Sequence, residues 1–178
     1  VGAPRPSRYT VAADMRTWVK RALKVVLGLL ALGAAAGGAF VYANASAYDA
    51  SMSRAYDVPP LAITASKDPA VIARGRHLSR SLAGCETHDC HGGDFGGGRV
   101  IDMGPVATLA APNVTNVMPS YTDGELGRLI RHGIKKDGRS VTFMPVMDFD
   151  WLPDSDVAAI VSYLRTVPPV ERPSQTTK

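Results

Sequence analysis

Two cysteines and a neighbouring histidine are the residues of this chain best suited to hold a cofactor. Cys85 and Cys90 are the two cysteines of the chain, and His91 directly follows the second. Cys-x-x-Cys-His is the attachment signature of c-type haem, in which two thiols form thioether bonds with the vinyl groups and the histidine binds the iron. Here four residues separate the cysteines, so the motif is Cys-x4-Cys-His. The loop between the thiols must bulge, because the porphyrin fixes the distance between its two anchors.

Three alternatives compete with haem at this segment. A Cys85–Cys90 disulfide would suit an oxidising compartment but would leave His91 and the glycines after it unexplained. A zinc site could use both cysteines with His88 and His91. Structural zinc usually takes two ligand pairs with a longer spacer between them, and four ligands within seven residues would close a tetrahedron only under strain. A coincidental arrangement is the third alternative. Haem is the preferred interpretation, and the others stay open at this point.

The positive charge of the chain is concentrated near its N-terminal end. The 178 residues carry a formal net charge of +4, from 20 Lys and Arg against 16 Asp and Glu. Residues 1–24 hold six cations and one acidic residue, a net charge of +5, which leaves −1 for residues 25–178. The basic balance therefore belongs to a leader, and no nucleic-acid partner is predicted.

An uncharged apolar run follows the basic leader. Val25 to Ala43 is nineteen residues long, and as a helix it would span roughly 28 Å at about 1.5 Å per residue, close to the thickness of a bilayer core. Because cations precede it, the positive-inside rule places the leader in the cytoplasm and the rest of the chain outside. A cleavable signal peptide is the alternative, since Ala43-Asn44-Ala45 and Ala45-Ser46-Ala47 both fit a cleavage site. A retained anchor is preferred, and both interpretations export residues 48–178.

These features divide the chain into five predicted parts. Residues 1–17 form a basic cytoplasmic leader, partly disordered, in which Met15 is an alternative start of translation to Val1. Residues 18–43 form the transmembrane anchor, and 44–67 form a polar tether interrupted by two prolines. A haem-binding domain covers 68–170, and a tail covers 171–178.

Three main helices are predicted within residues 68–170. Asp68-Pro69 opens the first, because aspartate is a favoured N-cap and proline suits the first helical position. Thr122-Asp-Gly-Glu125 is a capping box that starts the second. The third covers about 154–166 and is stopped by Pro168-Pro169. No strand-forming alternation recurs, so the predicted fold class is all-α: three main helices with long loops, preceded by one transmembrane helix.

With a short helix running into the attachment motif, residues 68 to about 170 resemble the class I c-type cytochromes. The chain is especially similar to membrane-anchored monohaem proteins and subunits that accompany bacterial periplasmic dehydrogenases and respiratory complexes. Expanded attachment loops occur at some sites of multihaem c-type cytochromes, so the Cys-x4-Cys-His spacing is compatible with the family. The resemblance implies one covalently attached haem c, bound through Cys85 and Cys90, with His91 as an axial ligand of the iron.

The resemblance also assigns roles to two residues further along the chain. Ala111-Pro112-Asn113 matches the family's Pro-Asn-Leu stretch, in which the proline carbonyl accepts a hydrogen bond from the axial histidine. Pro112 would thereby orient His91. Met144, followed by Pro145, stands where the family places its axial sulfur and is the expected sixth ligand. Three other methionines compete for that role: Met103, Met118 and Met147.

Several other side chains are expected to have structural roles. Tyr163 matches the family's aromatic that contacts a glycine of the first helix, here Gly75. His132 is expected in the last helical turn of the second helix, where a cation interacts favourably with the dipole. His77 and His88 are expected to be exposed.

A haem iron with two protein ligands has no open position for a substrate, so the resemblance implies single-electron transfer without substrate chemistry. The expected partners are redox proteins, namely a dehydrogenase, a respiratory complex or a terminal oxidase, and the expected location is the periplasmic side of a bacterial inner membrane. Two alternatives stay open. One is a haem enzyme or gas-binding sensor in which Met144 is absent from the iron or displaced. The other is a metal-binding or disulfide-stapled module without haem.

Overall fold

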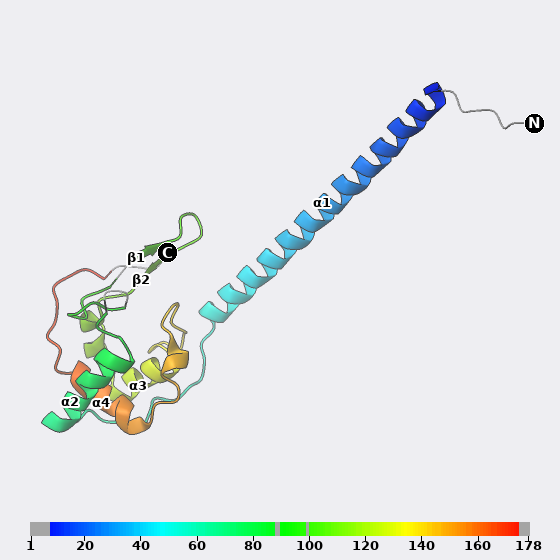
Figure 1. The fold of residues 1–178 in the computed structure, drawn as a ribbon. Coiled ribbons are helices and arrows are strands. Elements are labelled where there is room, and N and C mark those ends of the chain that lie inside the picture. Colours follow the sequence, from blue (N-terminus) through cyan, green and yellow to red (C-terminus); the bar gives the residue numbers. More distant parts are fainter. Residues whose placement is uncertain (1–7, 88–89, 99, 175–178) are drawn as a thin grey trace, which may run out of the picture. The chain divides into compact units, whose positions relative to one another are not determined.

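The computed structural model describes residues 8–87, 90–98 and 100–174, with the backbone alone for residues 8–14. The chain divides into two compact units, one up to Ala50 and one from Ser51 on. Their helices and strands are drawn in Figure 1. His88, which the sequence predicts to be exposed, lies outside the described residues, as do residues 1–7 of the leader.

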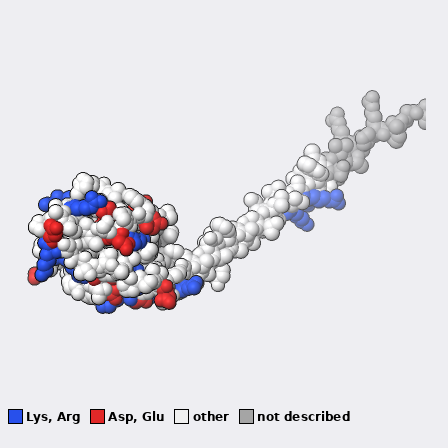
Figure 2. Space-filling model, turned by 90° about the horizontal axis from the view of Figure 1, so that it is seen from below, with Lys and Arg blue, Asp and Glu red and all other residues white. Residues whose placement is uncertain are grey.

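A single helix, α1 (Arg8–Ser53), makes up the first unit. Its 46 residues correspond to a length of about 69 Å at about 1.5 Å per residue. The portion Met15–Ser53 is long and apolar enough to cross a membrane, judged by length and composition. Figure 2 shows Lys and Arg near the N-terminal end of the described helix and an uncharged surface along its apolar portion.

The helix continues past the apolar run into the segment that the sequence predicts to be a tether. Residues 44–53 contain three alanines and no glycine or proline, so no residue there breaks a helix. The Asn44 side-chain amide donates to the Phe40 carbonyl at 2.8 Å, one turn earlier. The polar composition of this segment suggested a tether, but its helix-compatible residues extend α1 to Ser53.

The second unit contains the three main helices predicted from the sequence. They are α2 (Pro69–His77), α3 (Asp123–His132) and α4 (Asp154–Leu164). The Asp68 carboxylate accepts a hydrogen bond from the Ala70 amide, and both bonds of the Thr122–Glu125 capping box are present. Short helical turns complete the set: η1 (Leu78–Leu82), η2 (Val114–Asn116), η3 (Met118–Ser120) and η4 (Val146–Asp148).

A small β-hairpin accompanies the helices. Strands β1 (Val100–Asp102) and β2 (Thr108–Ala110) pair antiparallel, with Ile101 opposite Leu109. Strands of three residues are too short to give a recognisable alternation of polar and apolar positions. The hairpin was therefore not predicted, although the described fold is mostly helical as expected.

The core forms where α2 crosses α4. At the crossing, a Cβ atom on Gly75 would overlap the carbonyl of Ala159 and would lie 3.0 Å from the amide nitrogen of Ile160. The close approach of the two helices at Gly75 is as predicted, and the atoms nearest to the glycine are backbone atoms of α4. The backbone of Ala159 faces the glycine, whereas the Tyr163 ring packs edge-on against Phe95 at 6.2 Å between centroids. The buried apolar cluster comprises Leu78, Phe95, Met118, Leu126, Ile130, Phe149, Leu152, Val157, Ile160, Val161 and Leu164.

Residues 55–66, named the strap below, run along the second unit and are bonded to it. The Tyr56 amide donates to the Gly138 carbonyl at 2.9 Å, and the Leu61 amide donates to Gly124 at 3.1 Å. The buried Arg128 guanidinium donates to the Val58 carbonyl at 2.8 Å. The segment predicted to be a tether is therefore, over these residues, part of the packed unit.

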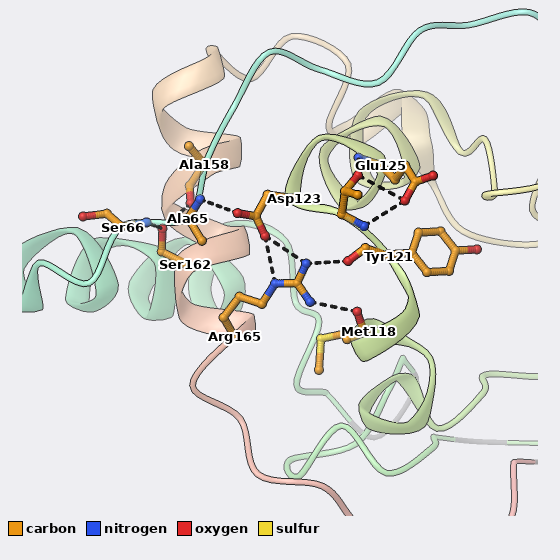
Figure 3. Close-up of polar contacts among 10 residues, drawn as sticks. Ala65, Ser66, Met118, Tyr121, Asp123, Glu125, Ala158, Ser162 and Arg165 are labelled. Carbon is orange, nitrogen blue, oxygen red and sulfur yellow. Dashed lines mark hydrogen bonds and ion pairs between the residues drawn. The ribbon is translucent and has the colours of Figure 1, made fainter.

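The end of the strap joins α3 and α4 through one carboxylate (Figure 3). Asp123 accepts hydrogen bonds from the Ala65 amide at 2.8 Å and from Nε of Arg165 at 2.9 Å. The same guanidinium donates to the carbonyls of Met118 and Tyr121 at 2.8 and 2.6 Å. The N-terminus of α3, the C-terminus of α4 and the turn before α3 are thus fixed to one another.

Candidate functional site

The segment holding the cysteines leaves the first helix through a widened turn. The π turn η1 follows α2 directly, and Gly84 then adopts a left-handed φ of 58°, which glycine reaches without steric cost. The Cys85 amide donates back to the Ser79 carbonyl at 2.9 Å. This reversal places Cys85 against the edge of the apolar core.

Backbone hydrogen bonds close the expanded loop between the cysteines. The Thr87 amide donates to Gly84 at 3.0 Å, the Cys90 amide donates to Thr87 at 3.1 Å, and the His91 amide returns to the Cys85 carbonyl at 3.1 Å. The bond from His91 to Cys85 brings the two ends of the loop together. The described residues on both sides of the loop are thus joined to one another.

Both cysteines are free thiols, and each is partly buried. Burial raises the pKa of the Cys85 thiol to about 11, since a thiolate is disfavoured where water is excluded. Cys85 is therefore a neutral thiol at physiological pH. No disulfide joins the two cysteines in the described structure, so the disulfide interpretation gains no support.

The structure brings His91 and Pro112 together. His91 Nδ1 lies 3.2 Å from the Pro112 carbonyl oxygen. Because a carbonyl only accepts, Nδ1 carries the proton and Nε2 keeps its lone pair. Burial lowers the pKa of the imidazole, and the bond to Pro112 opposes that shift only in part. His91 is thus a neutral imidazole whose Nε2 is free to bind a metal.

The loop that presents the Pro112 carbonyl is held by the next residue. The Asn113 side chain is fully buried. Its amide nitrogen donates to the carbonyls of Val170 and Arg172, both at 2.9 Å. Its oxygen accepts from the Thr115 amide at 3.0 Å and from the Thr115 hydroxyl. In the sequence, Asn113 is recognisable only as part of the motif around Pro112, and nothing there indicates that its side chain holds this loop.

The four candidate methionines have different surroundings. Met144 is partly buried and packs against the apolar core. Met147 and Met103 expose 82% and 45% of their surface, whereas Met118 is buried within the core. Met144 is thus the methionine of this set that lies at the edge of the core, as Cys85 does. No described contact joins Met144 to His91.

The histidines outside the attachment segment have the surroundings expected of them. His132 lies in the last turn of α3 and is exposed, and His77 is exposed at the end of α2. Among the described residues, no three His, Cys, Asp or Glu side chains are placed to hold a metal ion together. His88, a ligand of the zinc alternative, lies outside these residues.

The described side chains suit a haem. Two free thiols and an imidazole with a bare Nε2 lie in one short segment, and Met144 offers a thioether at the edge of the same core as Cys85. Leu82 and Phe143, close in the chain to Cys85 and Met144, expose 47% and 65% of their surface. Both side chains are apolar and accessible, so either could contact an apolar ring.

Comparison with known proteins agrees with this chemistry. A family model described as cytochrome c matches residues 73–168, which is more than half of the chain. The chain belongs to the cytochrome c family. The match begins within α2 and ends after α4, so it includes the attachment segment, Pro112 and Met144.

Relatives similar to this chain include subunits of bacterial dehydrogenases. The cytochrome subunit of fructose dehydrogenase from Gluconobacter japonicus is 33% identical over 114 residues, which are 60% of this chain and 24% of the relative. The cytochrome c subunit of alcohol dehydrogenase (quinone) from Gluconacetobacter polyoxogenes is 31% identical over 123 residues, which are 65% of this chain and 26% of the relative. The chain therefore spans about a quarter of the length of these curated relatives.

Membership of the cytochrome c family implies covalently bound haem c and electron transfer. As a member of this family, the matched domain is an electron-transfer component. The surroundings of its attachment loop were not predictable from the family motif. In particular, Glu86 between the cysteines bonds to two side chains of other elements, and its acidic side chain beside Cys85 was the only signal in the sequence.

Proposed function

We propose that this cytochrome is a membrane-anchored monohaem carrier that passes single electrons between redox partners outside the cytoplasm. Thioether bonds from Cys85 and Cys90 would hold the haem, with His91 and Met144 as its axial ligands. Haem c, when bound, alternates between ferrous and ferric iron and so takes up and releases one electron at a time. The residues of the chain would hold that iron in a fixed position, shielded from water.

The contact between His91 and the Pro112 carbonyl carries this proposal. A hydrogen bond to the second nitrogen of a ligating imidazole fixes its tautomer and ring orientation, and at 3.2 Å this bond leaves Nε2 free. The two thiols that flank the loop before His91 are unpaired. A neutral imidazole next to two free thiols supports covalent haem attachment better than it supports a zinc or disulfide site.

Met144 is the proposed sixth ligand, and this assignment favours a carrier over a haem enzyme. A thioether ligand would complete the coordination of the iron and raise its reduction potential. The partly buried position of Met144 beside the core supports the choice, since Met147 and Met103 are exposed and Met118 is enclosed by other side chains.

We further propose that α1 anchors the protein and that the haem domain includes the strap. The cations before Val25 favour a cytoplasmic N-terminus, with residues beyond the apolar run on the periplasmic side of a bacterial inner membrane. The hydrogen bonds of Tyr56, Leu61 and Ala65 to the second unit argue that the domain begins before residue 68.

The partners follow from the relatives. The relatives reported above are cytochrome subunits of fructose and alcohol dehydrogenases, so a membrane-associated dehydrogenase is the proposed electron donor. A respiratory complex or terminal oxidase would be the acceptor. The chain spans about a quarter of the length of those relatives. We therefore propose that it corresponds to one part of such a subunit.

A denaturing gel stained for haem tests the attachment. Haem should migrate with the wild-type polypeptide, and Cys85→Ala and Cys90→Ala should each reduce that staining. Haem that acid acetone extracts completely from the native protein would refute covalent attachment. The spectrum of the reduced protein separates the remaining alternatives, because a carrier gives six-coordinate low-spin bands and an open haem site gives five-coordinate high-spin bands.

A further inference from the structure

Glu86 lies between the two cysteines in the sequence, and its carboxylate is almost completely enclosed. Its side chain is 8% exposed, and both of its oxygens have partners. Nε of Arg80 donates to one oxygen at 2.7 Å, and the hydroxyl of Tyr163 donates to the other at 2.8 Å. These three residues are named the Glu86 clamp.

The clamp joins the loop to elements on both sides of it. Arg80 belongs to η1, which directly precedes the attachment segment, and Tyr163 belongs to α4. Tyr163 also packs edge-on against Phe95, which is buried in the core. The loop between the cysteines is thus bonded through one side chain to both the preceding turn and the last helix.

Burying a carboxylate in a surface loop is unfavourable unless its oxygens are paired, so this arrangement needs a reason. The loop contains four residues where two are usual. Glu86 is the first of those four residues and adjoins Cys85. Its two bonds fix the residue that follows Cys85 and so restrict how the Cys85 thiol is presented.

We propose that Glu86 is a positioning residue, which through Arg80 and Tyr163 holds the start of the expanded Cys-x4-Cys loop and so presents the Cys85 thiol for haem attachment. The inference rests on the proposed function, because it requires thioether bonds at Cys85 and Cys90. Each thiol adds its S–H across the C=C bond of a vinyl group. Sulfur bonds to one carbon and the proton goes to the other, so no oxidant or reductant is consumed.

The test measures attachment in the full chain expressed together with a haem-attachment system. Covalent haem per polypeptide is measured, together with the pyridine haemochrome spectrum, because an unreacted vinyl group shifts the haem absorption to the red. In Glu86→Ala the covalent haem should fall several-fold, and the remaining haem should show the red shift of a single thioether bond. Glu86→Gln, which keeps an acceptor for Tyr163 but no charge for Arg80, should give a smaller change of both measurements.

Asp156 offers a matched control. Its carboxylate, 12% exposed, pairs with Arg74 at 2.6 Å and bridges α2 and α4 away from the loop. Asp156→Asn should lower the melting temperature as Glu86→Gln does, yet it should keep the wild-type haem content and spectrum.

Three results would overturn the proposal. The first is a wild-type haem content and two-thioether spectrum in Glu86→Ala. The second is an equal loss of covalent haem in Asp156→Asn and Glu86→Gln. The loss would then reflect a lower stability of the fold and not the position of Glu86. The third is a wild-type protein without covalent haem, which would refute the proposed function as well and so differs from the other two.

Discussion

His91 Nδ1 lies 3.2 Å from the carbonyl oxygen of Pro112, 21 residues further along the chain. The acceptor is a backbone atom, so no single substitution removes it directly. A substitution can, however, change the position of the loop that carries the Pro112 carbonyl. Asn113 holds that loop to the carbonyls of Val170 and Arg172, and the orientation of His91 should depend on Asn113 for this reason.

Asn113→Ala should therefore destabilise the protein and disturb the axial histidine. The substitution removes the hydrogen bonds from the buried Asn113 amide to the Val170 and Arg172 carbonyls, which should cost about 1–3 kcal/mol in total. Denaturant unfolding measures the free-energy loss, and a redox titration measures the shift of potential expected from a less firmly oriented imidazole.

Asn116→Ala is the control for this prediction. Asn116 is exposed, and its side chain makes a 3.3 Å bond to the Arg172 carbonyl. Its removal should change the free energy of unfolding by no more than about 0.5 kcal/mol and leave the potential unchanged. Equal shifts of potential in both variants would contradict a specific role of Asn113.

Met144→Ala should convert a six-coordinate haem into one with an open position. The oxidised protein should lose the weak sulfur-to-iron charge-transfer band near the red end of its spectrum, and its potential should fall because the thioether favours ferrous iron. The reduced variant should bind carbon monoxide, which the wild-type protein should bind poorly.

The exposed methionines provide the controls for that experiment. Met147→Ala and Met103→Ala remove side chains that are 82% and 45% exposed, and both variants should keep the wild-type spectrum. Met118→Ala is less suitable, because emptying a buried site costs about 2–5 kcal/mol and could disturb the haem indirectly. A wild-type protein that binds carbon monoxide readily, with no change in Met144→Ala, would favour a ligand-binding haem protein.

The features predicted from the sequence are those that local residues determine. The N-cap at Asp68 and the Thr122–Glu125 capping box depend on neighbours within a few positions, so the starts of α2 and α3 could be read directly. The pairing of His91 with Pro112 was expected because both residues belong to motifs that resemble the cytochrome c family.

Contacts between distant residues could not be predicted in this way. Tyr163 reaches Glu86 across 77 positions, and Asp123 reaches Ala65 across 58. Such pairs depend on how α4 and the strap pack, which neither periodicity nor composition specifies. The segment 44–67 shows the same limit, because its polar composition predicted a tether where the structure has the end of α1 and the bonded strap.

The mature protein should keep α1 and stay with the membrane fraction. Intact-protein mass spectrometry and N-terminal sequencing decide this, with extraction at alkaline pH as the test of insertion. We expect a mature chain that includes Val25–Ala43 and resists extraction, because its apolar run is long enough to span the bilayer core. A mature N-terminus at Ser46 or Tyr48 would show that the helix is a cleaved signal, while export of the haem domain would still hold.

The last prediction concerns the acid stability of the strap. The hydrogen bond from the Ala65 amide, assisted by Arg165, lowers the pKa of Asp123 below its ordinary value. A carboxylate with a lowered pKa in the folded state stabilises the fold above its unfolded pKa of about 3.9, and this stabilisation is lost as the pH falls through the folded value. At neutral pH, Asp123→Asn should therefore cost up to about 1.5–3 kcal/mol, the range for hydrogen bonds to a charged group.

That cost should shrink in acid, where the wild-type carboxylate is itself protonated. Denaturant unfolding of the wild-type and variant proteins, at neutral pH and below a pH of about 4, measures the difference and cancels acid effects common to both. Asp137→Asn is the control, since Asp137 pairs with Arg139 two residues away and both side chains are about half exposed. An exposed pair of this kind contributes about 0–1 kcal/mol, so Asp137→Asn should change little at either pH. A difference for Asp123→Asn that stays constant with pH would mean that the amide disturbs packing, and that the charge of Asp123 does not hold the strap.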